Sequence, residues 1–153
     1  MSILCDWEIK ALSLGDQLIE PFVDHVIREE NNRKILSYGL GSYGYDIRLS
    51  SKQCLLFGGT SAGVCDPKSF DRSILKETEL REDEKGEYFL LPPYGYCLCV
   101  AHERLVLPED VTVLPAGKSS YARTGIHCNI TPAEGGWEGY LTLQISNSTG
   151  LFN

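Results

Sequence analysis

The sequence predicts a mainly β protein, a sandwich or barrel of short strands with one or two short helices. Short apolar or alternating runs recur along the chain, and turns rich in proline and glycine separate them. The chain has 153 residues, of which 42% are hydrophobic, which is enough for a globular core. We therefore expect a single domain over residues 1–153.

The N-terminal part is expected to begin with a helix over Trp7–Leu14, because Asp6 and Glu8 suit the start of a helix and Gly15 suits its end. A short strand and a proline turn follow over Leu18–Phe22. The charged stretch Val23–Lys34 is expected to be a solvated loop. Further along, the patterns predict strands over Tyr45–Leu49 and Cys54–Phe57 and a flexible turn over Gly58–Gly63.

The C-terminal part is expected to contain most of the strands. The charge run Glu77–Glu87 indicates a hairpin loop. Strands separated by turns are then predicted over Tyr88–Leu91, Gly95–His102, Val111–Pro115, Ile126–Thr131 and Tyr140–Ser146.

The charge and hydropathy of the chain exclude several classes of function. The net charge is −7 and no long basic run is present, so broad binding to nucleic acid is not expected. No apolar run is long enough to span a membrane. The segment Met1–Asp6 lacks the basic and apolar regions of a signal peptide, so we expect a cytoplasmic protein.

The six cysteines are expected to be reduced thiols, since no secretion signal accompanies them. Cys97 and Cys99 lie two apart in a strand pattern and would face the same side. They could form a metal pair or small core side chains, and the burial habits of free cysteine favour the core. Zinc nucleobase deaminases need H-x-E and a later P-C-x-x-C, which His102-Glu103 and the cysteine spacings do not match. We therefore expect no zinc and no other dedicated metal site.

Asp46 and Arg48 lie two apart on a predicted strand and so share a face. Arg48 could contact a phosphate or a neighbouring subunit. A structural ion pair is the alternative that we favour.

The segment between Gly117 and Asn147 is the most informative part of the chain. It contains G-K-S-S-Y-A-R-T-G, in which Lys118 and Arg123 supply cations and Ser119 and Ser120 supply hydroxyl donors. This combination suits an anion such as a triphosphate, although it is not a P-loop. The later A-E-G-G-W-E-G-Y could hold a sugar and a base, so together the two clusters indicate a nucleotide site.

At these residues the chain resembles the deoxycytidine triphosphate (dCTP) deaminase family of the trimeric dUTPase-like superfamily. The stretches Leu36–Ser50, Asp66–Lys68, Leu91–Pro93 and Leu18–Phe22 are also similar to that family. The resemblance implies a distorted jelly-roll or β-barrel that assembles as a homotrimer with active sites between subunits. It implies dCTP as the ligand, with dUTP or dTTP as the alternatives, and Mg²⁺ bound through the substrate phosphates.

The resemblance also implies roles for individual residues. Ser119 and Arg123 would orient the attacking water, while Lys118 and Ser120 would hold phosphates. The backbone of Ile130, Thr131 and Pro132 would contact the pyrimidine edge. Glu134 would meet the deoxyribose 3′-hydroxyl and Trp137 would pack on the sugar, unless Trp137 is a buried structural side chain.

Gln144 is the main departure from the family. The family places its water-activating glutamate here, within L-E-I/F-x-N, whereas this chain has Leu143-Gln144-Ile145-Ser146-Asn147. Glutamine can hold a water but cannot take its proton. Three functions therefore stay open: a dCTP deaminase of reduced or lost activity, a dUTP diphosphatase-type hydrolase based on Glu134, or a non-catalytic nucleotide-binding protein. Glu134 or Glu138 could also supply a different activity.

The second departure concerns the C-terminus. Family members continue with further strands and a segment that closes over the bound nucleotide with a tyrosine, a lysine and a glutamine. The sequence ends at Asn153 without them. From this difference we expect weaker nucleotide binding than in a longer relative.

Overall fold

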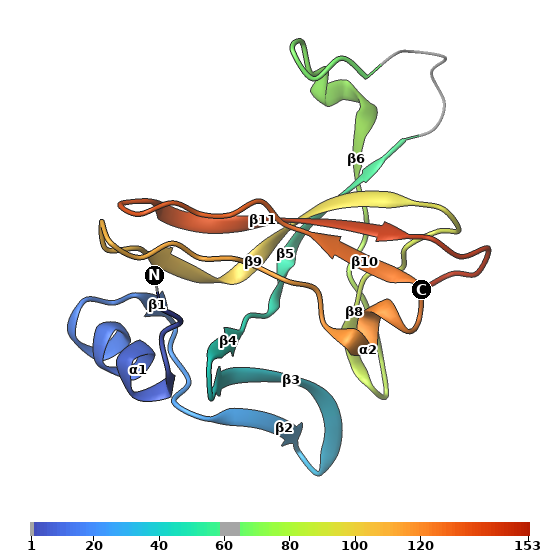
Figure 1. Ribbon diagram of the computed structural model, residues 1–153. Helices are drawn as coiled ribbons and strands as arrows, with labels where there is room; N and C mark the ends of the chain where they lie inside the picture. The colour runs from blue at the N-terminus through green and yellow to red at the C-terminus, as the bar shows by residue number, and fades with distance from the viewer. Residues whose placement is uncertain (1, 59–64) are drawn as a thin grey trace. The chain divides into compact units, whose positions relative to one another are not determined.

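The computed structural model describes residues 2–58 and 65–153, and antiparallel strands are its main regular structure (Figure 1). The described residues form two compact units by their contacts. The first unit contains residues 2–50, 100–116 and 130–142, and the second contains residues 51–58, 65–99, 117–129 and 143–153. The predicted mainly β class with short helices is confirmed. The predicted turn over Gly58–Gly63 lies, after Gly58, outside the described residues.

The first unit begins with helix α1 (Asp6–Gly15), which confirms the predicted helix. The residue before the helix, Cys5, donates from its backbone N–H to a carboxylate oxygen of Glu8 at 2.9 Å. This bond lowers the pKa of Glu8 and satisfies a backbone donor at the helix start. Strand β1 (Ile19–Glu20) follows and pairs antiparallel with strand β9 (Tyr96–Val106), with Ile19 opposite Leu105.

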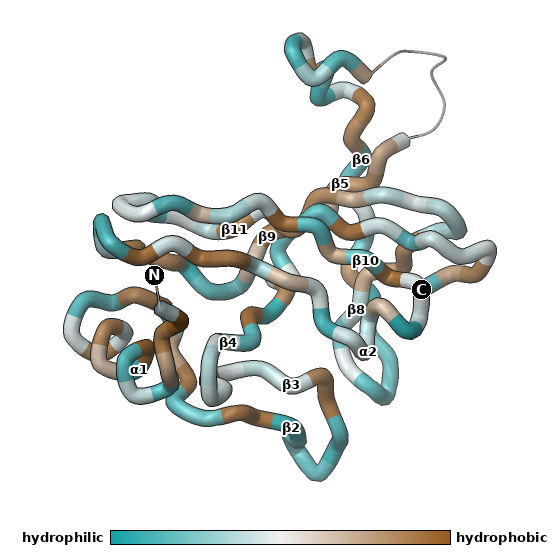
Figure 2. The backbone as a smooth tube through the Cα atoms, in the orientation of Figure 1, coloured by the Kyte–Doolittle hydropathy of each residue, from teal (hydrophilic) through white to brown (hydrophobic). Residues whose placement is uncertain are grey.

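The prediction of a solvated loop over Val23–Lys34 is wrong. Strand β2 (Val26–Glu30) and strand β3 (Arg33–Gly41) form a hairpin there, and β3 continues antiparallel into strand β4 (Gly44–Asp46). The turn residues Asn31 and Asn32 have φ of 51° and 60°, the left-handed pair that favours a tight hairpin. The charged side chains are exposed, and the tip of this hairpin is hydrophilic in Figure 2.

The second unit is built on one sheet with the strand order β10–β11–β9–β5–β6. Its strands are β5 (Leu49–Phe57), β6 (Leu75–Glu77), β9, β10 (Ile126–Asn129) and β11 (Glu138–Asn147), of which β5, β9 and β11 also contribute residues to the first unit. Burial alternates along β9, where Cys97, Cys99 and Ala101 are all 3% exposed or less. This period of two places the inward side chains in the core.

Shorter elements complete the second unit. A 3₁₀ turn, η1 (Arg72–Ile74), leads into β6, and strands β7 (Arg81–Asp83) and β8 (Gly86–Tyr88) form the hairpin that the charge run Glu77–Glu87 predicted. Of the strand predicted over Tyr88–Leu91, only Tyr88 lies in a strand. Leu91 instead exchanges two backbone hydrogen bonds with Asn153, of 2.7 and 3.1 Å.

The strand predicted over Val111–Pro115 is also wrong. Only Val113 pairs, through two backbone hydrogen bonds with Ala133 of 2.9 and 3.1 Å. Proline has no N–H to donate, so Pro115 cannot extend the pairing as a donor. Leu114 is 75% exposed, so the apolar run that predicted the strand does not face a core.

A buried ion pair lies inside the first unit. The Glu103 carboxylate has no exposed surface, and it accepts from Arg48 Nε at 2.7 Å and from the Arg48 backbone N–H at 2.8 Å. The Arg48 guanidinium also lies 4.3 Å from the centre of the Tyr38 ring. The favoured structural role of Arg48 is therefore confirmed, with Glu103 as its partner, while Asp46 accepts from the Ser37 hydroxyl at 3.2 Å.

Candidate active site

The predicted phosphate-binding turn forms a short helix, α2 (Ser119–Ala122), which packs against β10 in the second unit. Lys118 precedes it as the N-cap, and Arg123 follows it as the C-cap and donates its backbone N–H to the Ser119 carbonyl at 3.0 Å. Ser119, Ser120 and Arg123 are exposed. The turn thus presents two hydroxyls and a guanidinium to solvent, which are groups that bind phosphate oxygens.

The exit from α2 is fixed by close contacts. Gly125 has φ of +79°, and a Cβ placed on it would lie 2.2 Å from Thr149 Cγ2. The backbone N–H of Ser148 donates to the Gly125 carbonyl at 2.9 Å. The end of the cationic turn and the residues after β11 are therefore held together.

Gln144, the position of the family glutamate, lies half-buried in β11. It stands opposite Asn129 of β10, and Asn129 Nδ2 donates to Gln144 Oε1 at 3.4 Å. Asn129 belongs to none of the predicted motifs. The strand register alone reveals it, because residues directly opposite in an antiparallel pair share a face.

His127 lies on the same face of β10 as Asn129, by strand alternation. Its ring Nε2 is 3.2 Å from the Ser148 hydroxyl, which also donates to the Gly125 carbonyl at 3.0 Å. Nε2 of His127 therefore already has a hydrogen-bond partner, the Ser148 hydroxyl.

The end of β11 is anchored by Asn147, which is 2% exposed. Its Nδ2 lies within hydrogen-bond distance of three carbonyl oxygens, those of Leu91, Pro92 and Leu151, at 3.3, 3.0 and 2.6 Å. Its Oδ1 accepts from the backbone N–H of Thr149 at 2.9 Å. This amide fixes the strand that carries Gln144.

The other five predicted residues, Ile130, Thr131, Pro132, Glu134 and Trp137, belong to the first unit. The backbone N–H of Trp137 donates to the Glu134 carbonyl at 3.1 Å, which closes a tight turn. A Cβ on Gly135 would lie 2.2 Å from the Glu109 carbonyl oxygen, so the turn packs directly on Glu109. Glu109 belongs to no sequence motif, so only the structure reveals this contact.

Trp137 is half-buried rather than fully buried. A Cβ on Gly139, whose φ is +152°, would lie 3.1 Å from the indole ring of Trp137. Glycine at 139 thus lets the ring lie against the backbone. Of the two acids considered as alternative bases, Glu138 forms an ion pair with Arg104, and Glu134 is exposed.

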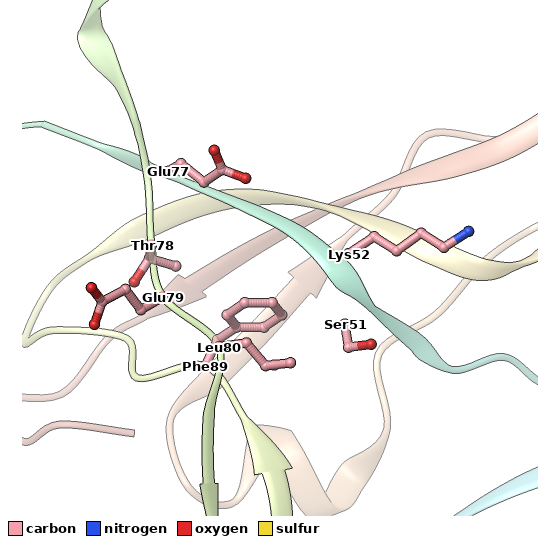
Figure 3. A pocket seen from close by; sticks show the side chains of 7 residues that line it. All are labelled: Ser51, Lys52, Glu77, Thr78, Glu79, Leu80 and Phe89. Atoms are coloured by element: carbon pink, nitrogen blue, oxygen red, sulfur yellow. The ribbon is translucent and has the colours of Figure 1, made fainter.

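A cavity of about 430 Å³ lies elsewhere in the second unit (Figure 3). It is lined by Ser51, Lys52, Glu77, Thr78, Glu79, Leu80 and Phe89. None of the predicted site residues lines this cavity.

Within the part of the chain that the structure describes, one group of three His, Cys, Asp or Glu residues converges as metal ligands could. It consists of Cys54, Cys97 and Cys99, whose sulfur ligands do not suit Mg²⁺. No carboxylate cage for Mg²⁺ is therefore formed among the described side chains.

Residues 3–151 match the family described as dCTP deaminase-like. The chain belongs to this family. It is 44% identical over 151 residues to a dCTP deaminase of Protochlamydia amoebophila, an alignment that covers 99% of this chain and 77% of that protein. The dCTP deaminase of Anaplasma phagocytophilum is 42% identical, over 99% of this chain and 76% of its own length.

A solved structure supports the fold. The 2′-deoxycytidine 5′-triphosphate deaminase from Agrobacterium tumefaciens aligns with a TM-score of 0.64 at 22% identity. The alignment covers 95% of this chain and 40% of that chain, so this chain spans less than half of the solved one. The fold expected from the resemblance is confirmed.

Among the described residues, the helices are all too short or too polar to cross a membrane.

Proposed function

We propose that this chain binds dCTP and catalyses its hydrolytic deamination to dUTP and ammonia, a step of pyrimidine deoxynucleotide metabolism. The observation that carries this proposal is identity of 40–44% to dCTP deaminases over nearly the whole chain. The exposed turn of Ser119, Ser120 and Arg123 supports it, because these groups suit a triphosphate or an attacking water.

The reaction consumes one water and releases one ammonia. Water adds at C4 of the cytosine ring. One of its protons goes to the departing amino group, which leaves as ammonia, and the other goes to ring N3, so that the product is uracil. Developing negative charge needs donors that are already in place. In the proposed site Ser119 and Arg123 orient the water, Lys118 and Ser120 contact phosphates, and the strand end at Ile130–Pro132 contacts the pyrimidine.

The remaining part of the proposed substrate site contacts the sugar. Glu134 accepts from the 3′-hydroxyl, and Trp137, which lies against Gly139, covers the sugar face. The half-burial of Trp137 supports this role, because part of the residue stays accessible.

Gln144 limits the rate in this proposal. Its side chain can position the water by hydrogen bonding, and its Oε1 already accepts from Asn129 at 3.4 Å. It has no carboxylate to receive the proton. A positioned general base typically contributes about 10²–10⁴-fold, so we expect turnover slower than in a relative with glutamate by about that factor.

Mg²⁺ enters the proposal as an ion carried on the substrate phosphates, where it neutralises charge. We also propose a homotrimer in which a neighbouring copy completes the site. In support, Ser119, Ser120 and Arg123 are exposed in the single chain. Six free cysteines support a reducing compartment such as the cytoplasm.

The test is ammonia release from dCTP by the chain and by Gln144→Glu, with dCTP affinity measured by calorimetry. We expect both proteins to bind dCTP within a few-fold of each other and Gln144→Glu to turn over at least about 10²-fold faster. Gln144→Met, which is similar in size but has no polar group, serves as the control and should gain nothing.

Binding without any gain in Gln144→Glu would show that residue 144 is not the site of the base. Absence of dCTP binding in both proteins would refute the proposed substrate. Pyrophosphate release from dUTP that is lost in Glu134→Ala would replace deamination with diphosphatase activity.

A further inference from the structure

Three cysteine thiols meet in the core of the second unit. Cys54 lies on β5, and Cys97 and Cys99 lie on the neighbouring strand β9. Their sulfur atoms all lie within 4.8 Å of one another, and the three residues are 2%, 3% and 1% exposed. Sequence spacing places Cys97 and Cys99 on one face, but only the strand order adds the third thiol.

The spacing of the sulfur atoms matches a metal site. Cys97 Sγ and Cys99 Sγ are 3.6 Å apart. A tetrahedral metal–sulfur distance of about 2.3 Å requires sulfur atoms about 3.8 Å apart, and a trigonal arrangement requires about 4.0 Å. Since all three sulfur atoms already lie within 4.8 Å, small rotations of the side chains would bring them to these distances.

Metal binding requires the thiolate form of cysteine. A cation that binds to the three sulfur atoms therefore displaces the thiol protons into solvent.

The ligand set selects the class of cation. Thiolates are soft ligands that prefer d¹⁰ ions such as Zn²⁺, Cd²⁺ or Cu⁺, whereas Mg²⁺ and Ca²⁺ prefer oxygen. Among the described residues the converging group contains cysteines alone. Burial in the sheet leaves little room for water ligands, which favours a three-coordinate or thiol-capped ion.

The sequence alone favours core side chains at Cys97 and Cys99 and no metal site. Because the structure adds Cys54 as a third thiol, we propose instead that Cys54, Cys97 and Cys99 form a binding site for one thiophilic d¹⁰ cation, which joins strands β5 and β9. This site is separate from the deamination chemistry proposed above and does not depend on it. The bound ion stabilises the folded state in proportion to its free concentration, because the unfolded chain does not hold the three thiols together.

The test uses the full chain, reduced with a phosphine and titrated with Cd²⁺. Thiolate coordination gives a charge-transfer absorption in the near ultraviolet, and native mass spectrometry counts the bound ions. We expect the absorption to saturate at one Cd²⁺ per chain and the melting temperature to rise with Cd²⁺ concentration. Cys54→Ser, Cys97→Ser and Cys99→Ser should each weaken binding by at least about 100-fold, since loss of a residue that only orients a metal ligand already costs roughly 10–100-fold.

The matched control replaces the three cysteines outside the cluster, Cys5, Cys65 and Cys128, with serine. This variant should keep the stoichiometry, the absorption and the melting shift. Loss of Cd²⁺ binding in the control, or no stoichiometric binding by the folded parent chain, would overturn the site. Circular dichroism checks that each variant is folded. Where a serine variant does not fold, the corresponding Cys→Ala variant replaces it. A parent mass lower by two protons, retained in the control variant, would indicate a cluster disulfide and also overturn the proposal.

Discussion

Removal of the Arg48 side chain provides a quantitative test of how the first unit is stabilised. Arg48→Met leaves the fully buried Glu103 carboxylate without its guanidinium partner, although the backbone N–H of residue 48 still donates to it. Loss of one partner from a buried ion pair costs about 3–5 kcal/mol. Because one donor remains and the Arg48 side chain is 28% exposed, we expect the lower end, about 3 kcal/mol.

Strand β9, which carries Glu103, supplies a matched control in Arg104. Its partners, Glu20 and Glu138, are both 59% exposed, so solvent screens these ion pairs. Exposed pairs of this kind contribute about 0–1 kcal/mol. Arg104→Met should therefore lower the free energy of unfolding by no more than about 1 kcal/mol.

Equilibrium unfolding in urea, followed by tryptophan fluorescence, measures both changes. Trp7 and Trp137 are the two tryptophans of the chain and both belong to the first unit, where the ion pair lies. The double variant Arg48→Met/Glu103→Leu removes both charges and should lose less stability than Arg48→Met alone. Equal losses in Arg48→Met and Arg104→Met would refute this reasoning, since burial would then not distinguish the two ion pairs.

Three further substitutions follow from the contacts described above. Asn147→Asp should lower the free energy of unfolding by about 3 kcal/mol in urea melts, because an acceptor would replace the amide group that faces three carbonyl oxygens. Gly135→Ala should lower the melting temperature, whereas Gly15→Ala should not, since a Cβ would lie 2.2 Å from the Glu109 carbonyl oxygen at 135 and meets nothing within 4 Å at 15. Hydrogen bonds from His25 and Lys10 lower the pKa of Asp24 from 3.8 to about 2. The contribution of Asp24 to the free energy of unfolding is therefore complete above pH 3.8 and is lost as the pH falls to about 2. The free energy of unfolding of Asp24→Asn should depend less on pH over this interval than that of the parent chain.

The strands predicted best from sequence are those with clear alternation. The predicted strand Gly95–His102 ends four residues earlier than β9, which continues to Val106. The prediction stops early because Glu103, at an inward position, interrupts the apolar pattern. The β2–β3 hairpin was missed for a related reason. Its strands are mostly charged and exposed, and only Asn31-Asn32 marks the turn.

The candidate site was predictable where its residues are close in sequence. The segment 118–123 was expected to act together, and it does form one turn. Asn129 opposite Gln144, and Cys54 beside Cys97 and Cys99, depend on strand order and register, which one sequence does not contain. The single domain over 1–153, the homotrimer and the effect of the C-terminus stay predictions.

The pairing of Asn129 with Gln144 has a consequence for how the chain could change over generations. An asparagine amide donates as well to a carboxylate as to an amide oxygen, so a glutamate at 144 would find its neighbour already suitable. Codons for glutamine and glutamate differ only in their first base. A point mutation could therefore restore the acid without any compensating change at residue 129.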